Sequence, residues 1–157
     1  MRLKEREVKD FGKMLGVLEK CDCCRVGFYD DGYAYMVPMN FGYAAKENAL
    51  TLYFHCASEG KKLDLLKKCD KVSFEADCSH ELVGGPRACD YTFRYASVMG
   101  KGKITVADTD EKKLIGLKAL MAHYAKNMSA TFSEKYLKSV TVLVLEVTEW
   151  SCKANEK

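Results

Sequence analysis

The sequence has few of the residues that divide a chain into separate units. Its only prolines are Pro38 and Pro86, and it contains no internal repeat, low-complexity tract or Pro/Ser-rich linker. A chain of 157 residues fits one domain, and a domain of that size buries roughly 68–70% of its unfolded surface. The composition therefore predicts a single domain over residues 1–157.

The chain also lacks a long apolar run and an export signal. No stretch approaches the ~20 apolar residues that span a bilayer. The N-terminus, MRLKEREVKD, is charged from its second residue and has no apolar h-region. The net charge of +3 is small, and lysines alternate with acids along most of the chain. We expect a cytoplasmic protein that binds neither membrane nor nucleic acid.

The eight cysteines lack the spacing of a metal scaffold. Structural zinc sites commonly use pairs at a C-x₂-C spacing. Such sites use two of these pairs, and neither the cluster at 21–24 nor the group Cys78, His80 and Cys89 supplies two. Without a signal sequence, a reducing compartment is the default. We therefore expect free, mostly buried thiols and no bound metal.

Hydrophobic periodicity and turn residues predict three helices and six strands. An apolar repeat over Val8 to Leu18 predicts a helix that ends near Cys21, Ser58 is the expected cap of a second, and Asp108 begins a third that runs towards Met128. The expected strands cover residues 24–29, 33–43, 49–55, 72–76, 91–107 and 139–150, with a turn at 30–32 and a bend at Gly100 and Gly102. This order predicts an α+β fold, mainly antiparallel β. Closing six strands removes exposed edges, so we expect a barrel with flanking helices.

One segment joins a strand end to a basic helix start. Leu52 to His55 is apolar and aromatic, Ser58 follows as a helix cap, and Lys61 and Lys62 fall in the first turn. Free backbone N–H groups and the helix dipole attract phosphate at such a place, although lysine there is unfavourable for an isolated helix. A bound phosphate resolves that conflict. A solvated basic helix with a routine cap is the other interpretation, and physics alone leaves both open.

His55 and Cys56 stand beside this helix start. The imidazole could donate a hydrogen bond to a ligand or act as an acid near neutral pH. A lone histidine at a strand end is, however, more often structural. Cys56 is either a reactive thiol or a small buried residue. Spacing alone does not decide between these roles.

Four sequence blocks follow one another along nearly the whole chain. They are Y-M-V-P-M-N-F-G-Y at 35–43, Y-F-H-C-A-S-E-G-K-K at 53–62, K-V-S-F-E at 71–75 and Y-A-S-V-M-G-K-G at 95–102. Together they resemble the flavin-binding split-barrel family of pyridoxamine-phosphate-oxidase-like proteins. The Y-F-H form resembles its nitroimidazole-resistance branch.

The resemblance implies a six-stranded split β-barrel that holds FMN, with FAD as the alternative, at a homodimer interface. The phosphate would meet the helix start, while the first two blocks line the isoalloxazine and the partner subunit completes the pocket. The cofactor-binding residues implied in this way are Val37, Pro38, Met39, Asn40, His55, Cys56, Ala57, Glu59, Gly60, Lys61, Lys62, Ser97 and Val98. Lys61 stands where relatives often carry arginine. Lysine keeps the charge but loses a bidentate fork, so we expect weaker cofactor retention.

The function implied by the resemblance is that of an FMN-dependent oxidoreductase acting on a small molecule. In this branch the expected reaction is reduction of a drug's nitro group to an amine, with His55 as the catalytic residue. The alternative is a flavin- or haem-binding carrier or sensor without turnover, in which His55 is a ligand or a packing residue. Pyridoxamine-phosphate oxidation itself is disfavoured, because the C-terminal region lacks an arginine-rich phosphate signature. Lys153 and Lys157 do not replace it.

Overall fold

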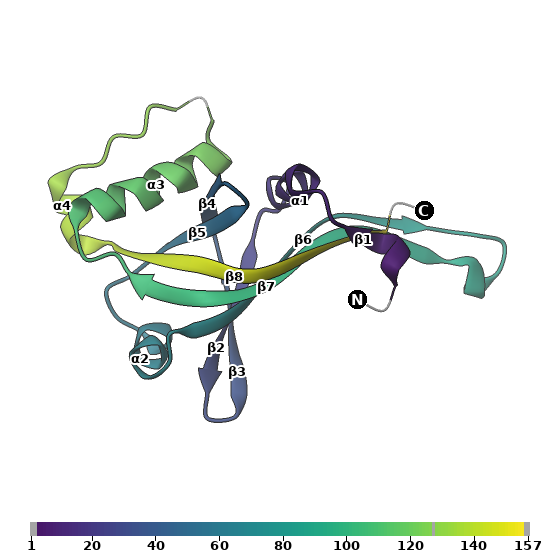
Figure 1. Cartoon of the computed structure of the whole chain (residues 1–157), viewed down its shortest axis with the longest axis horizontal. Helices are drawn as coiled ribbons and strands as arrows, with labels where there is room; N and C mark the ends of the chain where they lie inside the picture. The colour runs from purple at the N-terminus through teal and green to yellow at the C-terminus, as the bar shows by residue number, and fades with distance from the viewer. Residues whose placement is uncertain (1–2, 127, 156–157) are drawn as a thin grey trace.

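The computed structural model describes residues 3–126 and 128–155, which form one antiparallel sheet with helices on its two sides (Figure 1). The strands are β1 (Glu7–Val8), β2 (Cys24–Asp30), β3 (Tyr33–Met39), β4 (Phe41–Lys46), β5 (Ala49–Cys56), β6 (Lys71–Val83), β7 (Thr92–Val106) and β8 (Thr141–Asn155). The helices are α1 (Phe11–Leu18), α2 (Lys61–Lys68), α3 (Asp110–Tyr124) and α4 (Glu134–Ser139), with short 3-10 helices η1 (Lys4–Arg6) and η2 (Ala88–Asp90).

The sheet is curled but open. Its strand order is β3-β2-β6-β7-β8-β5-β4, and β1 adds to β8. β3 and β4 are consecutive in the chain, with Asn40 between them, yet they stand at opposite ends of this order. The predicted α+β class with mainly antiparallel strands is confirmed. The prediction that the strands close and remove every edge is wrong, and the described residues form eight strands rather than six.

Strand boundaries differ from the prediction where pairing partners change. The predicted strand 33–43 divides at Asn40 because β3 pairs with β2 whereas β4 pairs with β5. Pro38 is compatible with β3 because this is an edge strand, where a missing backbone N–H costs little. β6 and β8 are longer than predicted, since both continue along β7 (Figure 1). The expected bend at Gly102 coincides with a register shift between Lys101 and Gly102.

Helix starts are set by capping side chains that the sequence only partly indicated. α1 begins after Asp10, whose side chain accepts from the Lys13 backbone N–H at 2.8 Å. The predicted start at Val8 is wrong because Val8 pairs with Cys152 in the sheet. α3 is capped by Thr109 rather than Asp108, with 3.3 Å between the Thr109 hydroxyl and the Lys112 nitrogen.

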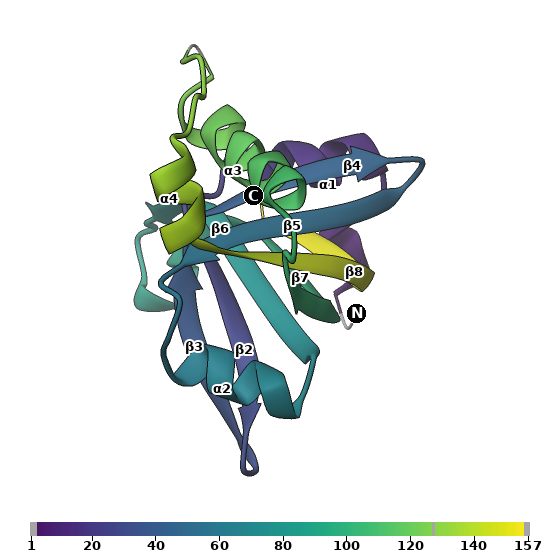
Figure 2. The ribbon, with the colours of Figure 1, turned by 90° about the vertical axis from the view of Figure 1, so that its left-hand side faces the viewer.

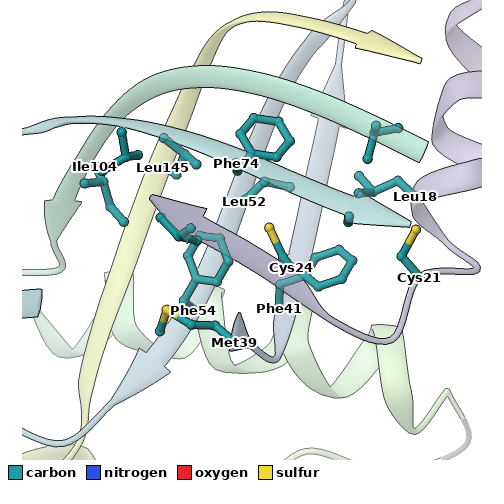
Figure 3. Close-up of a cluster of buried hydrophobic side chains, with 14 of the residues drawn as sticks. Leu18, Cys21, Cys24, Met39, Phe41, Leu52, Phe54, Phe74, Ile104 and Leu145 are labelled. Atoms are coloured by element: carbon teal, nitrogen blue, oxygen red, sulfur yellow. The ribbon is translucent and has the colours of Figure 1, made fainter. Parts of the chain in front are cut away.

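The main core fills the inside of the curled sheet (Figure 3). Phe28, Phe41 and Phe54 are almost fully buried there, together with Leu52 and Leu145. α3 and α2 lie on opposite sides of the sheet (Figures 1 and 2). In the described parts of the chain, no helix is both long enough and apolar enough to cross a membrane.

Candidate functional site

The gap between the two ends of the sheet order is bounded by the free edge of β3. β3 has β2 as its one strand partner, so its other edge carries backbone N–H and C=O groups that no described strand pairs. The chain then crosses at Asn40 to β4. Continuing the register that pairs Phe41 with Phe54 sets Asn40 opposite His55. The predicted segments 37–40 and 55–57 therefore meet at one place.

The start of α2 supplies further backbone donors. Gly60 precedes the helix with a φ of 131°, a conformation that favours glycine, and no side chain caps the helix here. Ser58 is thus not the cap that the sequence predicted. The carbonyl oxygen of Gly60 accepts from the nitrogen of Leu63 at 2.9 Å, which leaves the earlier N–H groups at Lys61 and Lys62 in the uncapped first turn. Such a turn favours an anion.

The two lysines of this turn diverge. Lys61 Nζ lies 2.5 Å from Asp30 Oδ2 and 4.9 Å from the centre of the Tyr35 ring, so it faces the β2–β3 hairpin. Lys62 is close enough to Cys56 to affect its thiol. Burial raises the pKa of Cys56, and the nearby Lys62 ammonium opposes that rise. Lys61 therefore faces the hairpin, in keeping with the crossing of α2 over β2 and β3 (Figure 2).

His55 is exposed at the end of β5. Side chains alternate along a strand, so His55 lies on the face opposite Phe54, which points into the core. Its cross-strand neighbour is Val142 of β8. An exposed imidazole at the mouth of the gap can reach a bound molecule without disturbing the core.

Segment 37–40 alternates between the core and the surface. Met39 is buried and Val37 is half-buried against the core, whereas Pro38 and Asn40 are exposed. The buried members can contact a ligand mainly through their backbone. An open groove of about 1140 Å³ also borders the helix start, and its lining includes Ala57, Glu59 and Gly60.

Ser97 and Val98 lie far from this place within one chain. Ser97 pairs with Lys153 near the end of β8, while His55 pairs with Val142 near its beginning. The two positions are roughly 36 Å apart along the strand at ~3.3 Å per residue. The Val98 side chain is in the core. Across the sheet, Val98 is in register with Met39 through Ala76 and Cys24, so it lies three strands away from β3.

Asp30 and Tyr35 are the site neighbours that sequence reasoning missed. Asp30 was interpretable only as a turn residue before Gly32, and Tyr35 only as part of a strand. A lysine in the first turn of a helix is stabilised by a nearby acidic group. The sequence contains several acids and gives no means of choosing among them.

Comparison with known proteins identifies the family to which a chain of this fold belongs. The family profile of pyridoxamine 5'-phosphate oxidase matches residues 13–154, so the chain belongs to that family. A solved structure of a putative 5-nitroimidazole antibiotic resistance protein from Bacteroides thetaiotaomicron superposes with a TM-score of 0.82. It is 30% identical over 96% of this chain and 90% of that chain. None of the curated proteins matches the sequence.

Two further solved structures share the fold at lower identity. The flavocytochrome Anf3 from Azotobacter vinelandii has a TM-score of 0.80 and 19% identity, over 100% of this chain and 72% of that chain. The FAD and heme binding protein from Mycobacterium smegmatis has a TM-score of 0.81 and 20% identity, over 97% of this chain and 74% of that chain. The split-barrel type of fold predicted from the sequence is confirmed, with an open sheet.

Proposed function

We propose that this protein is a flavin-dependent reductase that holds the flavin between the free edge of β3 and the start of α2. The observation that carries this proposal is the meeting of an unpaired strand edge with an uncapped, lysine-bearing helix start. FMN is the flavin we propose first. Its terminal phosphate matches one helix start, and FAD is the alternative.

The residues present fit a flavin in chemical kind. The flat isoalloxazine ring carries hydrogen-bonding groups along its rim, and these can form hydrogen bonds with the free backbone edge of β3. The half-buried side chains of Val37 and Cys56 offer apolar surface that the ring could contact. The flavin phosphate would accept from backbone N–H groups of Lys61 and Lys62 and from the Lys62 ammonium.

When bound, the flavin supplies the electron transfer, and the protein supplies placement and protons. Asn40 and His55 flank the strand crossing, so both would face the ring and its substrate. The His55 imidazole would deliver a proton from a ring nitrogen to the reduced substrate and recover one from solvent, to which it is exposed. Its exposure makes this exchange direct.

The substrate class we propose is a small aromatic nitro compound, reduced to its amine. Support comes from the 30% identical Bacteroides relative, which is named for 5-nitroimidazole resistance. To test it, the flavin-loaded protein is reduced anaerobically and mixed with a 5-nitroimidazole, and flavin reoxidation is followed together with the product mass. We expect reoxidation faster than with free FMN, and a two-electron product in this single turnover. The amine needs six electrons and six protons and releases two waters, so it should form when excess dithionite reduces the flavin again for two further cycles. Reoxidation at the rate of free FMN would contradict the proposal.

We further propose a homodimer in which each flavin is completed by the partner subunit. Support comes from the place of Ser97 on β7, three strands in from the free edge of β3. The outer face of the sheet near β3 also exposes Tyr33, whose exposure is 81%, and Met36. Light scattering of a dilute sample tests this, and a stable monomer that retains flavin would contradict it.

The eight free thiols are in keeping with a cytoplasmic location, which we also propose.

The second candidate function is a flavin or haem carrier without turnover. It is favoured by one observation, namely that two proteins of the same fold are named as a flavocytochrome and as a FAD and heme binding protein. An exposed histidine such as His55 is a suitable haem ligand. A Soret band after haem addition that His55→Ala abolishes would favour this function over the first.

A further inference from the structure

Lys61 is the first of the two lysines at the start of α2, and its ammonium already has an acidic partner. The ammonium lies 2.5 Å from Asp30 Oδ2, and the same Nζ lies over the ring of Tyr35. Asp30 is the last residue of β2. The contact therefore ties the start of α2 to the tip of the β2–β3 hairpin, next to the free edge of β3.

Acidic groups also lie close to other parts of α2. Lys67 pairs with Asp64 at 3.0 Å, and Glu59 directly precedes Gly60. No ion pair of Lys62 is found among the described residues, and its ammonium lowers the pKa of Cys56 against the rise caused by burial. A bound phosphate would therefore meet a helix start whose first lysine is electrically neutralised.

We propose that Asp30 competes with the flavin phosphate for Lys61 and thereby sets how strongly the protein prefers phosphorylated flavin over riboflavin. This inference rests on the proposed flavin site. An ammonium shared between a carboxylate and a phosphate brings two negative groups within a few ångströms of each other, which opposes binding of the phosphate. Arginine could serve both anions through separate N–H groups of its fork, whereas lysine offers a single nitrogen.

The partial exposure of the pair makes such competition feasible. The Asp30 side chain is 29% exposed and that of Lys61 is 54% exposed. Water can therefore solvate the carboxylate when the lysine turns to a phosphate, so no charge is left buried and unpaired. The opposite role, in which Asp30 orients Lys61 towards the phosphate, predicts the opposite result on removal of the carboxylate.

The test measures FMN and riboflavin affinities by flavin fluorescence for the wild type and Asp30→Asn. We expect the variant to bind FMN about fivefold more tightly with riboflavin affinity unchanged, since one nearby negative charge is removed. Asp31→Asn is the matched control, because this neighbouring acid is exposed in the turn and makes the same charge change. It should leave the FMN-to-riboflavin ratio near that of the wild type.

A second arm shows whether Asp30 acts through Lys61. In a Lys61→Ala background, Asp30→Asn should lose most of its effect on FMN. An unchanged or lowered FMN-to-riboflavin ratio in Asp30→Asn would overturn the inference while leaving the flavin site intact. A wild-type protein that binds neither FMN, FAD nor riboflavin would instead overturn the proposed function, and the inference with it.

Discussion

His123 on α3 is buried, with a side chain 3% exposed, whereas His55 at the end of β5 is exposed. The ring of His123 packs at a tilt against Phe41 and edge-on against Tyr124, at centroid distances of 4.5 Å and 4.6 Å. Its Nε2 donates to the Cys21 carbonyl oxygen at 2.9 Å. The two histidines thus have opposite surroundings: His123 packs between α3 and the sheet, and His55 is open to solvent.

The buried region uses its polar groups to connect elements. Tyr43 donates to Glu19 at 2.7 Å, and Lys126 forms an ion pair with the same carboxylate. Tyr124 donates to the Asp22 carbonyl oxygen at 2.8 Å. These contacts hold α3, α1 and β4 together. The region at α2 instead presents an uncapped helix start and a free strand edge. Polar groups stabilise the fold in the first region and are available to a ligand in the second.

The largest effect is expected where the buried region is most tightly packed. A Cβ added at Gly42 would stand 2.3 Å from the backbone carbon of Ala119, so α3 would have to move away from β4. We expect Gly42→Ala to lower the free energy of unfolding by about 3 kcal/mol in urea titrations. Gly16→Ala is the control, because nothing lies within 4 Å of its Cβ position. That variant should gain about 0.5–1 kcal/mol. Equal effects at both glycines would mean that α3 is not tightly packed.

The same substitution at each histidine tests the comparison directly. His123→Gln should lower the free energy of unfolding by about 2 kcal/mol, because it loses ring packing in a buried site. His55→Gln should change it by less than about 0.5 kcal/mol, since the residue is exposed.

His55→Gln should nevertheless slow reoxidation of the reduced flavin by a nitro substrate by about 100-fold, the scale of losing a positioned proton donor. Flavin affinity and single-turnover reoxidation are measured on the same preparation. If affinity collapses while turnover per bound flavin stays normal, His55 is a binding residue and not a catalytic one.

Removing the two lysines at the start of α2 tests whether this region holds the phosphate. Lys61→Ala with Lys62→Ala should weaken FMN by about tenfold or more and riboflavin little, because the lysines are assigned to the phosphate. Affinities come from the same fluorescence titrations. Lys67→Ala and Lys68→Ala together form the control at the other end of the helix. Equal weakening of FMN and riboflavin would place the phosphate elsewhere.

How much of this could be predicted from the sequence depends on the range of the interactions. Turn residues at 30–32 and the alternating apolar strands are local signals, and they predicted the β2–β3 hairpin and most strands correctly. The division at Asn40 arises because β3 pairs back with β2 and β4 pairs forward with β5, at opposite ends of the sheet order, and the continuous apolar run 33–43 gave no sign of that break. The same holds for Asp30 and Lys61, which only the placement of α2 brings together.

The network around Glu19 predicts a small pH dependence of stability. Burial by itself would raise the pKa of Glu19, but hydrogen bonds from Lys126 and Tyr43 lower it below its ordinary value of 4.5. Its contribution to stability is therefore present above pH 4.5 and is lost as the pH falls through the lowered pKa. Glu19→Gln should flatten this acid limb in urea titrations at several pH values. An acid limb that is as steep in the variant would contradict the assignment.

Tyr43 gives the corresponding alkaline limb. Burial, followed by its bond to Glu19, raises the pKa of Tyr43 to about 12 from an ordinary 10.0. Its stabilisation is full below pH 10 and is lost as the pH rises towards about 12. Tyr43→Phe should remove this loss. Thermal unfolding midpoints of both proteins across that range check the sign.

The most direct test of the central claim is the visible spectrum of the purified protein after addition of flavin and removal of the unbound excess. The account predicts retained flavin bands at about one flavin per chain, with FMN retained better than riboflavin because the start of α2 holds the phosphate. A protein that retains no flavin, or that takes up haem with a Soret band and excludes flavin, would contradict the assignment of the β3 edge and α2 as a flavin site.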